Sequence, residues 1–183
     1  MPVTVTPDTF TMVDFDAATI TAIAERLVTE IGLPADVPVI VRVEERTPMG
    51  RVRLLSLDPV DLSIEGGAIE DPKSMRKLSP TRAVDVLGQQ LFQVRDRLDP
   101  AFGAPALGEP IPLPHQVAWD VYAVGRVARL GHPAQHQRRL YQFRNRHGFT
   151  DAADAAFENL WRTADGLTWD ALVSVSDRAR SPV

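Results

Sequence analysis

Apolar residues recur every three or four positions after Asp16, and Gly32 ends the repeat. The stripe consists of Ile20, Ile23, Leu27 and Ile31. This spacing places side chains on one face of an α-helix, and Asp is a favoured N-cap residue. The sequence therefore predicts an amphipathic helix over 16–31. Residues 1–15 alternate only loosely, which predicts one or two short extended segments before it.

Three segments with a period of two follow this helix. They cover residues 37–44, 51–57 and 60–65, and they are separated by turn residues that include Pro48, Gly50 and Pro59. Alternation of apolar and polar side chains is typical of strands with one buried face. Because the connections are short, we expect these strands to form a three-stranded antiparallel meander.

The rest of the chain has the three-to-four spacing of helices. Ser79 and Pro80 form an N-cap and first-turn pair for a helix over 80–98. Helices are also predicted over 115–130, from near 133 to 148, over 151–164 and from 168 onward, with a Pro/Gly-rich connector at 99–114. The 115–130 helix is apolar nearly all round, so we expect it to be buried, with Gly125 allowing a close helix contact.

These elements predict an α+β fold in one domain over 1–183. Its first part, 1–72, contains the helix and the meander, and its second part, 79–180, is helical. Strands and helices that are segregated along the chain favour this class over a parallel α/β sheet. A length of 183 residues with 44% apolar and 24% charged residues suits one globular domain.

The amino-acid composition limits the kinds of chemical site that the protein can contain. The chain has no cysteine, which removes disulfides, thiol catalysis and Cys-based metal sites. No apolar run is long enough to cross a bilayer, and the first residues lack the pattern of a secretion signal, so we expect a cytoplasmic protein without a membrane partner. All but two of the basic residues are Arg, as in proteins from GC-rich bacterial genomes.

The histidines suggest a metal site that the sequence does not complete. His132 and His136 are four residues apart, a spacing that can hold zinc on a helix, and His147 follows eleven residues later. However, no glutamate lies between the first two, Pro133 places His132 before the helix, and no carboxylate nearby completes a ligand set. We therefore expect no metal and no cofactor.

The order of a helix and a short meander before a second helix is similar to that of zincin-type zinc peptidases. The counterpart of their active-site helix would be 80–98, which has Gly88-Gln89-Gln90-Leu91-Phe92 at its middle. None of the three essential residues of the His-Glu-x-x-His signature is present there. The resemblance implies, at most, a catalytically inactive relative.

Positive charge is concentrated in one segment. Residues 113–149 contain six arginines and one acidic residue, although the whole chain has a net charge of −4. Arg138, Arg139, Gln142 and Arg146 would share the polar face of the 133–147 helix, and His136 and His147 belong to the same helix. We interpret the three arginines and the two histidines as a candidate anion-binding site. The alternative is a solvated surface that pairs with acidic residues on the next helix.

No motif in the sequence identifies an activity. The interpretation that fits it best is a non-catalytic binding or protein-interaction domain with an anionic ligand or a protein partner. The second is an enzyme, or an inactive zincin-like domain, that handles anions with these His and Arg residues. Nucleic-acid binding through the 133–147 helix comes third, because the overall pI is near 5.5.

Overall fold

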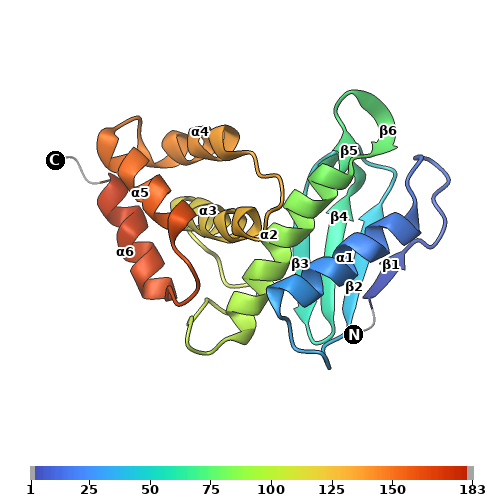
Figure 1. Ribbon diagram of the computed structural model, residues 1–183, viewed down its shortest axis with the longest axis horizontal. Coiled ribbons are helices and arrows are strands. Elements are labelled where there is room, and N and C mark those ends of the chain that lie inside the picture. Colours follow the sequence, from blue (N-terminus) through green and yellow to red (C-terminus); the bar gives the residue numbers. More distant parts are fainter. Residues whose placement is uncertain (1–2, 181–183) are drawn as a thin grey trace. The chain divides into compact units, whose positions relative to one another are not determined.

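The computed structural model describes residues 3–180, and the contacts within the chain divide it into two compact units (Figure 1). The first unit ends at Arg95 and the second begins at Asp96. The first contains β1 (Val3–Thr6), α1 (Ala17–Ile31), β2 (Val39–Glu44), β3 (Val52–Leu57), β4 (Val60–Glu65), a 3-10 turn (Gly66–Ala68), β5 (Glu70–Asp71) and β6 (Ser74–Leu78). Helix α2 (Pro80–Leu98) begins in the first unit and ends in the second.

The sheet of the first unit is mixed, and this corrects the predicted meander. Its strand order is β1-β2-β4-β3, with β1, β2 and β4 parallel and β3 antiparallel to β4. The three predicted strands do form, but β2 pairs with β4 rather than with β3, and β1 adds a fourth strand. The coarser prediction, a fold that combines helices with a sheet, agrees with the structure.

The burial of alternate residues explains this order. The inward residues of β2 and β4, such as Val41 and Leu62, are completely buried, whereas β3 has no fully buried residue. Strands with the most apolar inner face take the central positions, which leaves β3 at the edge. Strand β1 is parallel to β2, and α1 supplies the crossover connection that neighbouring parallel strands need. The alternation reveals the strands but not which strands pair.

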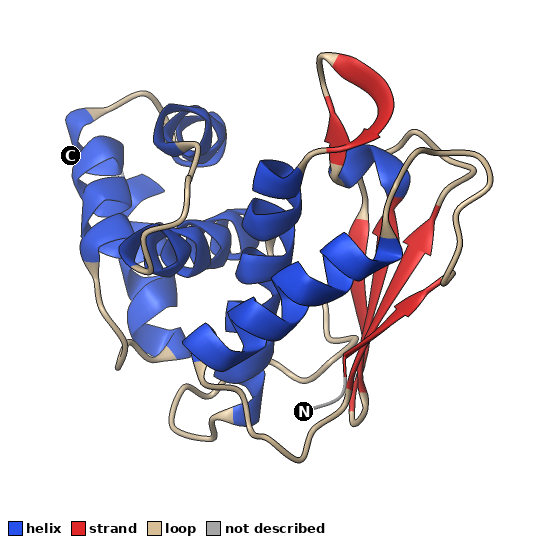
Figure 2. Cartoon of the chain, turned by 45° about the vertical axis from the view of Figure 1, so that its right-hand side comes forward, coloured by secondary structure: helices blue, strands red, loops and turns tan. Residues whose placement is uncertain are grey.

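Both helices of the first unit begin where the sequence predicts. The Asp16 carboxylate accepts hydrogen bonds from the N–H groups of Ala18 and Thr19, and Gly32 ends α1 with a φ of 74°. At the start of α2 the Ser79 hydroxyl accepts from the N–H of Arg82 at 3.4 Å. Both helices lie on the same side of the sheet (Figure 2). The short β5–β6 hairpin was not predicted, because it is largely exposed and lacks an apolar alternation.

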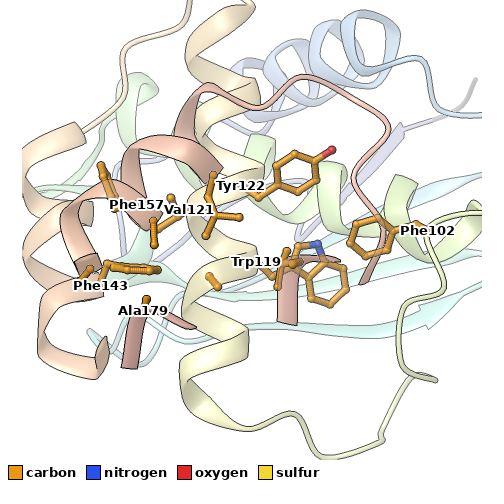
Figure 3. Packing of buried hydrophobic residues seen from close by; sticks show 12 residues of the cluster. Phe102, Trp119, Val121, Tyr122, Phe143, Phe157 and Ala179 are labelled. Carbon is orange, nitrogen blue, oxygen red and sulfur yellow. The ribbon is translucent and has the colours of Figure 1, made fainter. Parts of the chain in front are cut away.

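The second unit is helical and its core surrounds α3. Its helices are α3 (Leu113–Arg129), α4 (His136–His147), α5 (Asp151–Arg162) and α6 (Trp169–Arg180). The core cluster includes Phe102, Trp119, Val121, Tyr122, Phe143, Phe157 and Leu172, several of which Figure 3 labels. Residues 118, 119 and 121–127 of α3 are all buried, so the prediction of a buried central helix is confirmed.

One face of α3 is fixed against the end of α5. Tyr122 donates its hydroxyl to the carbonyl of Ala164, and Arg129 donates to the carbonyls of Trp161 and Thr163. Gly125 lies between them: a Cβ placed there would be 2.3 Å from the Trp161 carbonyl oxygen. The predicted close contact at Gly125 is therefore confirmed, and the glycine is needed for space.

We expect Gly125→Ala to lower the free energy of unfolding by about 2 kcal/mol or more, because the new methyl group overpacks a backbone contact. Helix propensity alone would raise that free energy by about 1 kcal/mol, so the sign of the change tests the contact. Urea denaturation measures it, with Gln137→Ala, an exposed position of α4, as the control. A stabilised Gly125→Ala protein would contradict the packing.

We further expect Val121→Asp to prevent folding of the second unit, since it places a carboxylate in the core of that unit. Arg138→Ala changes an exposed side chain and should alter stability by less than about 0.5 kcal/mol. Circular dichroism and denaturation midpoints compare the two variants. Equal midpoints would show that the core is assigned wrongly.

Candidate functional site

The candidate site is a groove of about 310 Å³ between α3 and α4. This volume lies at the lower end of the range of small-molecule pockets. Both walls belong to the second unit. The groove is lined by Leu113, Val117, Asp120, Val121, Arg139, Gln142, Asn145 and Arg146.

Helix α3 supplies the apolar floor. Leu113, Val117 and Val121 follow one another at intervals of four residues, so they form one stripe along the helix. Val121 is part of the buried core, Val117 is partly buried against it, and Leu113 at the open end is 49% exposed. The floor is therefore anchored in the core at one end and open to solvent at the other.

Helix α4 supplies the polar wall. Arg139, Gln142 and Arg146 are separated by three and four residues and lie on one face, with Asn145 beside them. Helix α4 contains no acidic residue. One carboxylate, that of Asp120, lines the groove from the α3 side and accepts a hydrogen bond from the Gln116 amide at 2.9 Å. The polar lining thus contains two guanidinium groups, one carboxylate and two amides.

The five predicted site residues lie on different sides of α4. Arg139 and Arg146 line the groove, whereas Arg138 is exposed outside it and donates to the Gln135 side chain at 3.3 Å. The His136 ring points toward α5, where its Nε2 lies 2.9 Å from a Glu158 carboxylate oxygen. His147 is buried. The structure brings together only the two groove arginines of this set.

His147 makes a buried hydrogen bond to Ser176 on α6. Its Nδ1 lies 3.1 Å from the Phe143 carbonyl, which can only accept, so Nδ1–H donates and Nε2 accepts from the Ser176 hydroxyl at 2.8 Å. Burial lowers the pKa of His147, and the positive charge of Arg180 lowers it further. The hydrogen bond between Ser176 and His147 resembles that between a serine nucleophile and its histidine base. Ser176 has no exposed surface, however, so we assign the pair a structural role in the packing of α4 against α6.

No residues in the described part of the chain form a metal site. Residues 3–180 contain no group of three or more His, Asp or Glu side chains that could hold an ion. His136 and His147 have separate partners on α5 and α6. On α2, Gly88 and Phe92 occupy the ligand positions of the zincin signature, and neither has a side-chain atom that binds zinc.

The α3 side of the groove was missed by sequence reasoning. Gln142 was expected on the polar face of α4, but nothing indicated that Asp120 and the Leu113–Val117 stripe would face it. The one available signal was that Asp120 is the single acidic residue of the 113–149 segment. A single carboxylate in a largely apolar segment indicates the side that meets polar neighbours.

Comparison of the chain with models of protein families, with curated proteins and with solved structures found no match. None of the helices in residues 3–180 combines the length and apolar character that a bilayer crossing requires. Any assignment of function therefore depends on the geometry of the groove.

We expect the stability of the protein to fall as the pH decreases below about 6.5, the ordinary histidine pKa. The pKa of His147 is lowered in the folded state, so unfolded chains take up a proton that folded chains do not, and acid favours unfolding. Urea midpoints between pH 8 and 5 measure the slope. His147→Gln should flatten it, whereas identical slopes in the two proteins would refute this account.

Proposed function

We propose that the protein is a non-catalytic binding module and that the α3–α4 groove is its ligand site. The observation that carries this proposal is the position of Arg139 and Arg146 on the wall of a groove whose floor is apolar. Guanidinium groups bind carboxylates and phosphates through charge-assisted hydrogen bonds. An anionic ligand with an apolar or planar body fits both surfaces.

The length of the groove favours an extended ligand. The Cα atoms of Arg139 and Arg146 lie seven residues apart on a helix, which is about 10 Å along its axis. A ligand that contacts both arginines therefore spans two helical turns. Asp120 on the opposite wall repels anionic groups from the floor and directs them toward α4. Chains with repeated negative charges meet these requirements better than a single small anion does.

The chemistry of the lining supports binding rather than catalysis. The groove residues are aliphatic, amide and arginine side chains together with one carboxylate, without a hydroxyl nucleophile or a histidine. The histidine and serine that could form such a pair, His147 and Ser176, are buried elsewhere. An enzyme would need a reactive group within reach of the bound ligand.

The test is a titration of the protein with polyphosphate, polyglutamate and a short oligothymidylate at two ionic strengths. We expect at least one of them to bind, with an affinity that decreases as salt increases. The double variant Arg139→Gln, Arg146→Gln should weaken that binding by about tenfold or more and flatten its salt dependence, because two charge-assisted contacts are lost.

The double variant Arg178→Gln, Arg180→Gln is the matched control, because it also removes two exposed positive charges, both on α6 and outside the groove. It should retain the affinity of the unaltered protein. If none of the three polyanions binds, or if the Arg139/Arg146 double variant binds as well as the control, the groove is not a ligand site.

A further inference from the structure

We propose that the ligand of this groove is single-stranded nucleic acid, which contacts α4 through its phosphates and stacks its bases on Tyr141 and Phe149. This inference rests on the proposed function, since it uses the same wall of α4. It adds the exposed residues beside the groove, which the binding of a simple anion would leave unused.

Two aromatic side chains are exposed next to the groove wall. Tyr141 is 58% exposed and Phe149, just beyond the end of α4, is 64% exposed. Their ring centroids lie 5.9 Å apart at an angle of 69°. Large aromatic side chains are normally buried, and exposed ones are typical of binding surfaces. The pair thus provides ring faces on which planar groups can stack.

The aromatic pair continues the polar face of α4. Arg138, Tyr141 and Asn145 follow one another at intervals of three and four residues, and this stripe runs beside the groove stripe of Arg139, Gln142 and Arg146. A ligand that lies along α4 therefore meets guanidinium groups, amides and aromatic rings on one continuous face.

The charge of this face favours phosphates. Among the residues that the structure describes, no carboxylate is recorded within ion-pair distance of Arg138 or Arg146, and Arg138 bonds only the neutral Gln135 side chain. Asp154, in the first turn of α5, is neutralised by Arg144, whose Nε donates to it at 2.7 Å. Arg144 also lies over the Phe149 ring, 6.0 Å from its centroid.

Single-stranded nucleic acid can contact all the arginine, amide and aromatic side chains of this face, whereas other polyanions can contact only some of them. Proteins that bind single strands combine a basic track with aromatic side chains that stack on bases. The amides of Gln142 and Asn145 can both donate to and accept from base edges. In a duplex the bases stay stacked on one another, so only the phosphates can contact this face of α4. An acidic peptide pairs with the arginines but supplies no series of planar groups for the rings.

The experiment measures the anisotropy of a labelled oligothymidylate with the complete protein. Tyr141→Ala and Phe149→Ala should each weaken its binding by about tenfold, the effect of losing one stacked base. Tyr141→Phe, which keeps the ring, should restore the affinity. The control Leu130→Ala shortens another exposed apolar side chain of the second unit, outside the groove, and should leave binding unchanged. Binding of polyphosphate should be the same in all four variants.

The outcomes separate this inference from the proposed function. Tight binding of a duplex or of polyglutamate relative to the single strand, or an unchanged affinity of Tyr141→Ala, would overturn the nucleic-acid assignment. If the Arg139/Arg146 double variant still lost binding in that case, the groove would remain an anion site with another ligand. If no polyanion bound, or if binding did not depend on Arg139 and Arg146, both proposals would be overturned.

Discussion

An ion pair between Asp96 and Arg126, buried inside the second unit, determines how its central helix is oriented. The guanidinium group donates to both carboxylate oxygens, at 2.7 and 2.6 Å, and lies 3.8 Å from the centroid of the Tyr122 ring. The Trp119 indole donates to the same carboxylate at 2.7 Å. Both charged residues are less than 5% exposed, so loss of one would leave an uncompensated charge, at a cost of several kcal/mol. The pair thereby fixes the rotation of α3 about its axis.

That rotation has consequences on two other faces of α3. It directs the face that contains Gly125 toward the end of α5, where no side chain fits. It also directs Val117 and Val121 toward α4, where they become the floor of the groove. On α4, adjacent residues have different roles for the same reason: Gln142 and Arg146 line the groove, while Phe143 and His147 are packed inside the unit. The candidate site thus depends on how two helices are rotated rather than on a local motif.

The sequence was sufficient to predict the helices and the strands β2, β3 and β4, because their signals are local. Asp16 and Ser79 mark helix starts, and Gly125 signals a close contact inside a helix, as the structure confirms. Strand pairing could not be predicted, since the alternation in β2, β3 and β4 is compatible with more than one order. Of the site, the positive face of α4 was predictable. The α3 floor of the groove could not be predicted, nor could the division of the His and Arg residues among separate faces of α4. Both depend on contacts between segments that are distant in the sequence, and the periodicity of a segment does not encode such contacts.

The mixed sheet of the first unit also has a feature that bears on self-association. Its terminal strands in the sheet order are β1 and β3, and neither has a long regular edge. The pairing of β3 with β4 shifts register between Leu54 and Ser56, and β1 ends directly before Pro7, which has no N–H to donate. Bulges and prolines at strand edges prevent the regular ladder that joins sheets of different molecules into fibrils. At high concentration the protein should therefore resist the growth of β-aggregates from this sheet, even though both terminal strands contain valine.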